Sequence, residues 1–210
     1  MKYYPVFLDI RGKKCVVVGG GEVAARKVSR LLGCEAHVLV VSPQLTPELI
    51  TLKAEGAIEH VAADYDSRYI KEAVLVIGAT NNEKINAAVS SDARSRGIPV
   101  NIVDDPQKCN FILPAVVERG DLTIAVGTGG KSPALARRLR EELEAKYGME
   151  YAILLKILGS LRPQMKDSAS GKKWCESLLA CGILDLIAAE DWEKVKETVQ
   201  AITGEEVPLD

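Results

Sequence analysis

Charge of one sign, long apolar runs and metal-binding patterns are all scarce in this sequence. Its 210 residues include 27 Lys or Arg and 29 Asp or Glu, for a formal net charge of −2. A chain this close to neutral gives no reason to expect a nucleic acid or an anionic membrane surface as partner. The longest apolar stretches, such as Val38–Val41 and Val74–Ile77, have the length of strands and are too short to cross a bilayer.

Histidines and paired cysteines, the usual ligands of structural metals, are also scarce. The five cysteines form no C-x-x-C pair, so we expect reduced thiols rather than disulfides or a zinc site. His37 and His60 each fall at the edge of a predicted strand, where neither is a good candidate for a metal ligand or a catalytic base. Residues 1–14 lack the apolar core and cleavage site of a signal peptide. We therefore expect a cytoplasmic protein without a bound metal.

A glycine-rich turn between a strand pattern and a helix pattern is the most informative feature that the sequence does contain. Val16–Val18 run directly into Gly19–Gly21, and a helix-favouring stretch follows. Gly19, Gly21 and Ala24 fit the pattern G-x-G-x-x-A, in which the glycines bring the backbone close to a pyrophosphate and the small third residue lets the helix pack against the strand. The helix N-terminus adds N–H groups and a partial positive charge. These residues predict a dinucleotide-binding site.

Strand and helix patterns alternate along the first 113 residues. Strands are expected at 5–10, 14–18, 37–41, 58–62, 74–77 and 99–103. Helices are expected at 22–32, from a Thr46-Pro47 cap to just before Gly56, at 66–73 and at 83–96. This alternation predicts an α/β fold of the Rossmann type, with a doubly wound parallel sheet.

The pattern changes after residue 113. Two strand candidates, 111–117 and 122–126, are joined around Arg119-Gly120-Asp121 and predict a hairpin. A charged helix is expected from the Ser132-Pro133 cap to about Tyr147. Four further helices, at 151–161, 172–179, 183–189 and 192–202, predict a small helical domain.

The segment after the second buried strand reads Ser42-Pro43-Gln44 and lacks a feature that is common in dinucleotide sites. It offers no acid to bind the adenosine ribose and no arginine to bind a 2′-phosphate. Ser42 and backbone groups could serve the ribose, or Ser42-Pro43 could simply end the strand. The choice between NAD and NADP stays open at this segment.

Polar residues follow two further strands, at the carboxyl edge where doubly wound sheets bind ligands. Thr80 is a candidate for cofactor binding, while Asn81 or Asn82 could cap the helix that follows. Asp104-Asp105 could act as a pair of acid and base, although a plain Asp-Asp-Pro turn is the more frequent explanation of such a sequence.

Gly130-Lys131-Ser132 is similar to part of a phosphate-binding P-loop. The full pattern requires glycine at position 125, where the chain has Ala125, and Pro133 removes an N–H from the helix start, so we reject an ATPase. The loop could still bind a carboxylate. Three arginines follow on the predicted helix, namely Arg137, Arg138 and Arg140. At least two of them are better explained as part of a solvated helix face, where glutamates balance their charge.

Six segments, taken in order, resemble the N-terminal module of siroheme synthases. This is the precorrin-2 dehydrogenase family, some members of which are also sirohydrochlorin ferrochelatases. The segments are Tyr4–Leu8, Val17–Ala24 with Arg26-Lys27, Ala79–Asn81, Asn101–Asp104, Phe111–Ala115 and Gly129–Ala136. Their order and spacing match over about 150 residues, a domain-sized stretch.

The resemblance implies an NAD-binding Rossmann domain at 1–113, a dimerisation segment at 114–147 and a helical domain at 148–210, which work as a homodimer. It implies the NAD+-dependent removal of two hydrogens from the tetrapyrrole precorrin-2, which gives sirohydrochlorin and NADH. Some members then insert Fe2+, a substrate rather than a cofactor. Because the sequence contains no methyltransferase domain, we expect that the chain does not make precorrin-2 itself.

The resemblance, together with the chemistry of the side chains, gives expected roles to individual residues. Asp104 becomes the catalytic residue, as the base for the proton lost with the hydride. Residues expected to bind the cofactor, NAD rather than NADP, are Gly19, Gly21, Glu22, Val23, Ser42, Pro43, Gln44 and Thr80. Residues expected to bind the substrate are Asn101, Thr128, Lys131 and Ser132. Thr128 keeps a hydroxyl where some bifunctional members have serine.

A non-enzymatic NAD-sensing module, such as those attached to ion transporters, is the alternative from a different class. It would share the glycine fingerprint, but the segments 101–104 and 129–136 and the helical tail do not suit it. An NAD(P)-dependent reductase of another small substrate is a third class. It would need a Tyr-x-x-x-Lys pair or a well-placed histidine, and the sequence offers neither.

Overall fold

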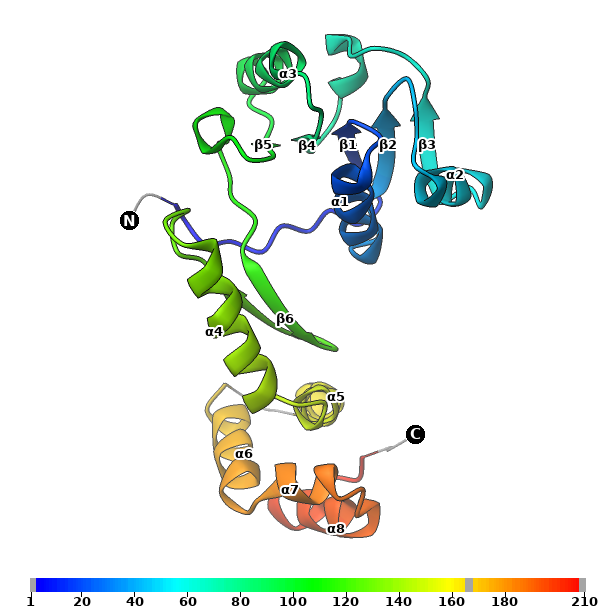
Figure 1. Cartoon of the computed structure of the whole chain (residues 1–210). Helices are drawn as coiled ribbons and strands as arrows, with labels where there is room; N and C mark the ends of the chain where they lie inside the picture. Colours follow the sequence, from blue (N-terminus) through cyan, green and yellow to red (C-terminus); the bar gives the residue numbers. More distant parts are fainter. Residues whose placement is uncertain (1–2, 165–167, 208–210) are drawn as a thin grey trace. The chain divides into compact units, whose positions relative to one another are not determined.

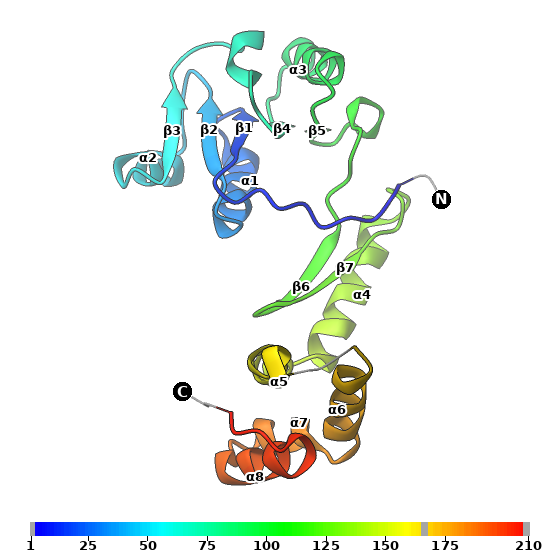
Figure 2. The ribbon, with the colours of Figure 1, turned by 180° about the vertical axis from the view of Figure 1, so that it is seen from behind.

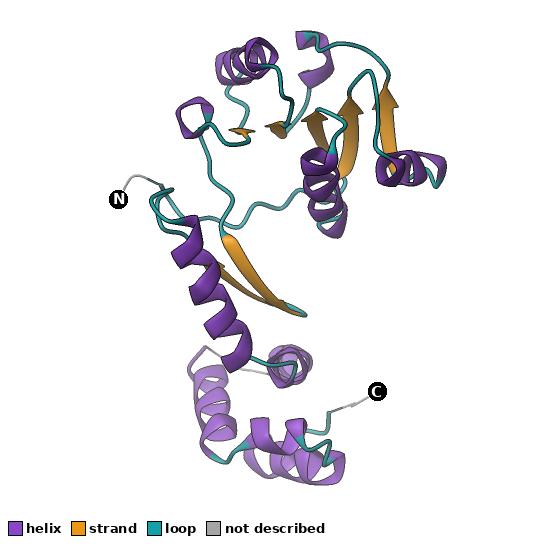
Figure 3. Cartoon of the chain, viewed as in Figure 1, coloured by secondary structure: helices purple, strands orange, loops and turns teal. Residues whose placement is uncertain are grey.

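The computed structural model describes residues 3–164 and 168–207 and divides into two compact units, one ending at Leu113 and one beginning at Pro114. The first unit is a five-stranded parallel sheet with helices on both faces (Figure 1, Figure 3). Its strands lie in the order β3-β2-β1-β4-β5. They are β1 (Lys14–Val18), β2 (His37–Val41), β3 (Ile58–Val61), β4 (Leu75–Gly78) and β5 (Val100–Ile102). This confirms the predicted doubly wound α/β fold.

Successive residues of each strand face opposite sides of the sheet, and both sides are covered. On one side the strands pack against α1 (Glu22–Gly33) and α2 (Pro47–Ala54). On the other side they pack against α3 (Glu83–Ser95) and the short 3-10 turn at Ser67–Ile70. The central strands are therefore almost wholly apolar, as the sequence predicted.

The predicted strand at 5–10 is wrong. Residues 4–10 run without regular structure and join neither sheet of the described chain. The side chains of Tyr4, Val6 and Phe7 stay largely exposed, and only Ile10 enters the core. Apolar residues in an extended segment become a strand only where a sheet edge offers backbone hydrogen bonds, and none of the described strands pairs with this segment.

Two other predicted elements are shorter or displaced. The helix expected at 66–73 is only the 3-10 turn at Ser67–Ile70, which Asp66 caps by accepting a hydrogen bond from the Arg68 nitrogen at 2.8 Å. The strand expected to begin at 111 begins at Ala115 instead. Pro114 has no N–H to donate to a ladder, and the carbonyl of Phe111 accepts a side-chain hydrogen bond from Asn101 at 3.1 Å.

The second unit begins with the predicted antiparallel hairpin of β6 (Ala115–Arg119) and β7 (Leu122–Val126), seen from behind in Figure 2. The Arg119 guanidinium joins the hairpin to α4 by donating to the carbonyls of Glu144 and Tyr147, both at 3.0 Å. The predicted helices are confirmed with boundaries shifted by at most a few residues. They are α4 (Pro133–Lys146), α5 (Glu150–Leu161), α6 (Ser168–Ala180), α7 (Ile183–Ala188) and α8 (Trp192–Thr203).

The last four helices form a core of their own. It is built from buried aliphatic side chains such as Leu154, Leu178 and Val195. Across residues 3–164 and 168–207, no helix is both long and apolar enough to cross a membrane.

Candidate functional site

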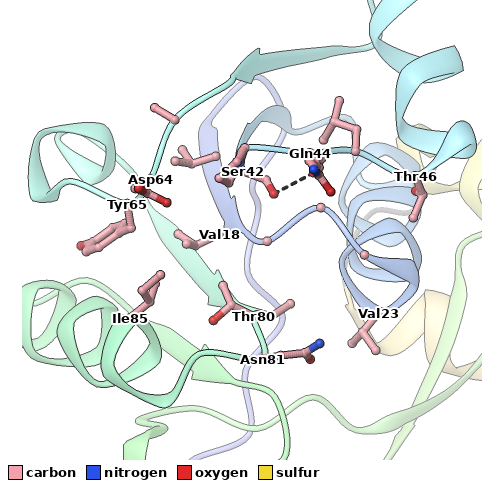
Figure 4. A pocket seen from close by; sticks show the side chains of 18 of the residues that line it. Val18, Val23, Ser42, Gln44, Thr46, Asp64, Tyr65, Thr80, Asn81 and Ile85 are labelled. Carbon is pink, nitrogen blue, oxygen red and sulfur yellow. Dashed lines mark hydrogen bonds between the residues drawn. The ribbon is translucent and has the colours of Figure 1, made fainter.

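A cavity of about 640 Å³ lies at the carboxyl ends of β1, β2 and β4, where the strand order reverses (Figure 4). Doubly wound sheets bind their ligands at this reversal. All eight residues that the sequence suggested for cofactor binding line this one cavity. They are Gly19, Gly21, Glu22, Val23, Ser42, Pro43, Gln44 and Thr80.

Two of the glycines are required because neighbouring backbone lies against them. A β-carbon at Gly19 would overlap the carbonyl oxygen of Ala79, and the φ of +126° at Gly19 is itself a conformation that favours glycine. A β-carbon at Gly20 would overlap the carbonyl oxygen of Gln44 and lie 2.7 Å from Oγ of Ser42. The turn after β1 is thus packed between the ends of β2 and β4.

Gly21 has a different reason to be glycine. It occupies the N-cap of α1, no side chain caps the helix there, and a β-carbon at this position would meet nothing within 4 Å. The opening N–H groups of α1 therefore face an open part of the cavity, which suits an anionic pyrophosphate. Ala24 is fully buried, in agreement with close packing between α1 and β1.

The turn after β2 is rigid but carries no acid. The Ser42 hydroxyl donates a hydrogen bond to the Gln44 carbonyl at 2.7 Å, and Nε2 of His60 lies 2.9 Å from the Ser42 carbonyl. Nδ1 of His60 lies 3.3 Å from Nζ of Lys53. His60 thus contacts the turn through its ring nitrogen, in line with the expectation that it is not a metal ligand or a catalytic base.

Thr80, the cofactor-binding candidate after β4, lies beside the cap of α3. Its side chain lines the cavity, while its Oγ1 lies 2.9 Å from Oδ1 of Asn86 and 3.1 Å from the carbonyl of Asn82. Asn82, rather than Asn81, caps α3 by accepting hydrogen bonds from the nitrogens of Lys84 and Ile85. The edge of β4 is therefore both a helix cap and a wall of the cavity.

Several residues that line this cavity were not predicted as site residues. Thr46 sits at the N-cap of α2 as predicted, but its hydroxyl makes no capping bond and has no hydrogen-bond partner among the described residues. Asp64 and Tyr65, from the segment after β3, line the cavity as well. The Tyr65 hydroxyl donates to Oδ2 of Asp92 at 3.0 Å, and burial, reinforced by Asp92, raises the pKa of Tyr65. No local motif marks these residues, since only the sheet order places β3 beside β2.

The two aspartates after β5 have different environments. Asp104 is exposed and adopts a φ of +60°, a left-handed conformation that non-glycine residues seldom take. Asp105 caps the 3-10 turn Pro106–Lys108 and forms an ion pair with the Lys108 ammonium. The hydrogen bond from Lys108 lowers the pKa of Asp105. Asp105 is therefore a turn residue, whereas the Asp104 carboxylate forms no hydrogen bond or ion pair with the residues that the structure describes.

A thiol and an amide hold the strand end that carries Asp104. The Cys109 sulfur lies 3.2 Å from the Ile102 nitrogen and 3.2 Å from the Asp105 carbonyl oxygen. The Asn101 side-chain amide donates to the Phe111 carbonyl at 3.1 Å and lies 3.5 Å from the Cys109 sulfur. Asn101, expected to bind substrate, thus has at least part of its hydrogen-bonding capacity used within the first unit.

Lys27 is a cation of α1 whose charge interacts with that of Asp104. It lies on α1 one helical turn after Val23, is partly buried, and has no ion-pair partner among the described residues. Burial lowers its pKa, Arg30 and Arg26 lower it further, and the carboxylate of Asp104 opposes these effects. The negative charge of Asp104 therefore partly offsets the effects that lower the pKa of Lys27.

The glycine loop of the second unit is built around two hydroxyls. The Thr128 hydroxyl donates to the Ser132 carbonyl at 3.0 Å and lies 3.3 Å from the Ser132 nitrogen. Ser132 caps α4 by accepting a hydrogen bond from the Leu135 nitrogen at 3.2 Å, as predicted. Gly129 and Gly130 both have positive φ, and Lys131 is exposed at the tip of the loop.

Two of the three arginines of α4, Arg137 and Arg138, are exposed, as the sequence favoured, and Arg140 is partly buried. They pair with glutamates one turn later: Arg137 with Glu141, Arg138 with Glu142 and Arg140 with Glu144. Among the described residues, no group of three or more His, Cys, Asp or Glu is arranged to hold a metal ion.

Fold and cavity together define a dinucleotide-binding protein of the Rossmann type. A family model described as "Putative NAD(P)-binding" matches residues 6–115, more than half of the chain, and one described as "Sirohaem biosynthesis protein central" matches residues 119–146. The chain therefore belongs to the "Putative NAD(P)-binding" family, and its central segment matches the sirohaem-biosynthesis model, as the sequence motifs indicated.

Curated relatives agree with this assignment. The siroheme synthase of Thioalkalivibrio sulfidiphilus is 40% identical over 204 residues, which are 95% of this chain and 42% of that protein. The siroheme synthase of Methylobacillus flagellatus is 44% identical over 170 residues, which are 81% of this chain and 36% of that protein. The chain thus spans less than half the length of these relatives.

One solved structure resembles the chain over nearly its whole length. The structure titled "SirC, precorrin-2 dehydrogenase" superposes with a TM-score of 0.77 at 24% identity, covering 97% of this chain and all of that one. The two chains share a fold.

Proposed function

We propose that the chain is an NAD+-dependent dehydrogenase that converts precorrin-2 to sirohydrochlorin. One observation carries the proposal: a cavity built for a dinucleotide opens at the same sheet edge at which β5 ends in the exposed Asp104. The similarity to siroheme synthases and to a structure titled precorrin-2 dehydrogenase supports the choice of substrate.

The residues present fit a nicotinamide dinucleotide. The glycine turn brings backbone up to the cavity, the start of α1 suits the pyrophosphate, and the Thr46 hydroxyl is an unused polar group in the wall. Bound NAD+ supplies the hydride acceptor. The resemblance favours NAD over NADP, and residues Glu22-Val23 and Pro43-Gln44 are the proposed contacts.

Removing two hydrogens from the tetrapyrrole releases one hydride and one proton, so the protein must supply a base. The Asp104 carboxylate is our candidate, because it is exposed while the neighbouring Asp105 is held by Lys108. Its exposure lets the proton pass on to water.

Precorrin-2 carries many carboxylates, so its site needs cations and N–H donors. We propose that Lys131 and the start of α4 at Ser132 bind these carboxylates, with Asn101 and Thr128 as further contacts. The segment 114–147 is proposed as a dimerisation segment of a homodimer, between an NAD-binding domain at 1–113 and a helical domain at 148–210. A cytoplasmic location fits this chemistry.

Insertion of Fe2+ into sirohydrochlorin is a second proposed activity. It is supported by the name siroheme synthase, because siroheme is the iron-containing product of the relatives. Iron would enter as a substrate, and the Asp104 carboxylate could take up the pyrrole protons that the metal displaces.

The experiment incubates the purified chain with precorrin-2 and NAD+ under anaerobic conditions, with and without Fe2+. We expect NADH and the sirohydrochlorin chromophore to form together, and the siroheme chromophore to follow only with iron. Binding of NADH without turnover and without a shift in the tetrapyrrole absorbance band would instead indicate an NAD-sensing module.

A further inference from the structure

The charged side chains that line the nucleotide cavity are both acidic. They are Glu22, at the first position of α1, and Asp64, in the segment after β3, and the lining includes no Lys, Arg or His. A dinucleotide brings two phosphates, which the start of α1 can receive. A third phosphate on the adenosine ribose would find no cation in this wall, although phosphates on a ribose are normally recognised by Arg or Lys.

The sheet order brings Asp64 close to the end of β2, where doubly wound sheets bind the adenosine ribose. We call this part of the cavity the ribose end. β3 pairs with β2 in parallel register, Val41 opposite Val61, and the Ser42 nitrogen donates to the Val61 carbonyl at 3.1 Å. The ends of β2 and β3 therefore lie side by side, and the chain leaves β3 along the cavity wall. Figure 4 shows Asp64 and Tyr65 on the same side of the cavity as Ser42.

The segment that carries Asp64 is anchored, but the carboxylate itself is free. The adjacent Tyr65 is fixed to α3 by its hydrogen bond to Asp92. Asp64 is exposed and has no hydrogen-bond or ion-pair partner among the described residues. A fixed backbone with an unused carboxylate is suited to accepting hydrogen bonds from a ribose and to repelling a phosphate.

We propose that Asp64 is the residue that selects NAD(H) over NADP(H), in place of the acid that is missing after β2. The inference rests on the proposed function in one respect, namely that the cavity holds a nicotinamide dinucleotide. The usual acid stands at the end of the second strand. Asp64 instead follows β3, the strand next to β2, and lies at the same part of the cavity. Its negative charge opposes the 2′-phosphate of NADP(H), and the free ribose hydroxyls of NAD(H) can donate to it.

Calorimetric titration of the whole chain with NADH and with NADPH tests this assignment. Asp64→Asn removes the charge and keeps the shape, and Asp64→Arg adds a cation. Glu59→Gln is the matched control, because Glu59 is an exposed acid of β3 outside the cavity lining. We expect the wild-type chain to bind NADH more tightly, and Asp64→Asn to lower the Kd for NADPH by about fivefold, the effect of one unit charge at close range in water.

The outcomes separate the inference from the function on which it rests. The inference is supported if Asp64→Asn lowers the Kd for NADPH, Asp64→Arg lowers it further, and Glu59→Gln leaves it unchanged. A variant with a damaged fold would instead bind both NADH and NADPH more weakly. An unchanged NADH to NADPH ratio in both variants overturns the inference and leaves the proposed function standing. A wild-type chain that prefers NADPH also overturns it. A wild-type chain that binds neither nucleotide contradicts the proposed function itself.

Discussion

Gly20 and Gln44 lie so close together that a β-carbon on Gly20 would overlap the carbonyl oxygen of Gln44. The contact joins the turn after β1 to the turn after β2, and both turns line the cavity. Gly20→Ala should force the two turns apart, lower the free energy of unfolding by about 1–3 kcal/mol and weaken NADH binding. Urea unfolding and calorimetric titration measure the two effects.

Gly21→Ala is the matched control for that prediction. A β-carbon at Gly21 has open space around it, and the φ of −87° suits alanine. The chain should lose less stability than with Gly20→Ala, because only the preference of the N-cap for glycine over alanine is lost. The added methyl group stands where a pyrophosphate would approach and lowers NADH affinity. Equal loss of stability in both variants would contradict the distinction between a packing glycine and a ligand-facing glycine.

Asp104→Asn separates chemistry from folding at the end of β5. Asparagine tolerates the left-handed conformation that Asp104 adopts, so the stability of the chain should change little. Loss of a general base should lower the turnover of precorrin-2 by about a hundredfold or more, while the Kd for NADH stays near the wild-type value.

Asp105→Asn is predicted to do the reverse. It removes the charge that pairs with Lys108 but keeps a side-chain oxygen that can cap the 3-10 turn, so it should lower the free energy of unfolding slightly. Turnover of the folded chain should remain within a few-fold of wild type. If Asp105→Asn loses turnover and Asp104→Asn does not, the two roles are assigned the wrong way round.

The charge on Lys27 should cost stability in a pH-dependent way. Burial, Arg30 and Arg26 lower the pKa of Lys27 in the folded chain, so folding disfavours its ammonium form. This loss of stability is fully present below the pKa that Lys27 has in the folded chain. It disappears as the pH rises past the pKa of lysine in the unfolded chain, about 10. Lys27→Met should therefore raise the free energy of unfolding at neutral pH, and this gain should shrink near pH 10. A gain that grows with pH would contradict the assignment.

The cysteines should differ sharply in reactivity. Cys15 is fully buried in β1, and burial raises its pKa to about 11, whereas Cys34 is exposed at the end of α1. Iodoacetamide at pH 8 should modify Cys34 in the folded chain and Cys15 only after unfolding. Mass spectrometry of the modified peptides checks this, and early modification of Cys15 would show that the sheet opens locally.

Most of the first unit could be predicted because its strands are buried on both faces. Val16–Val18 and Val38–Val41 read as continuous apolar runs, and glycines and prolines mark where the elements end. The glycine fingerprint, the strand ends and the family resemblance together gave eight candidate cofactor contacts, and the structure brings all of them into one cavity.

What the sequence did not predict depends on contacts between distant residues. Asp64 enters the cavity only because β3 lies beside β2, and no local pattern records that order. Gly20 stands at a variable position of the G-x-G-x-x-A pattern, and only the fold places the carbonyl of Gln44 against it. The segment at 5–10 has the alternation of a strand but finds no pairing edge among the described strands.

Anaerobic turnover of precorrin-2 with NAD+, measured side by side for the wild-type chain and Asp104→Asn, tests the central claim most directly. The account predicts one NADH formed for each sirohydrochlorin by the wild-type chain, and little of either product from Asp104→Asn although it still binds NADH. Wild-type protein that binds NADH but forms neither product, or Asp104→Asn that turns over at the wild-type rate, would contradict it.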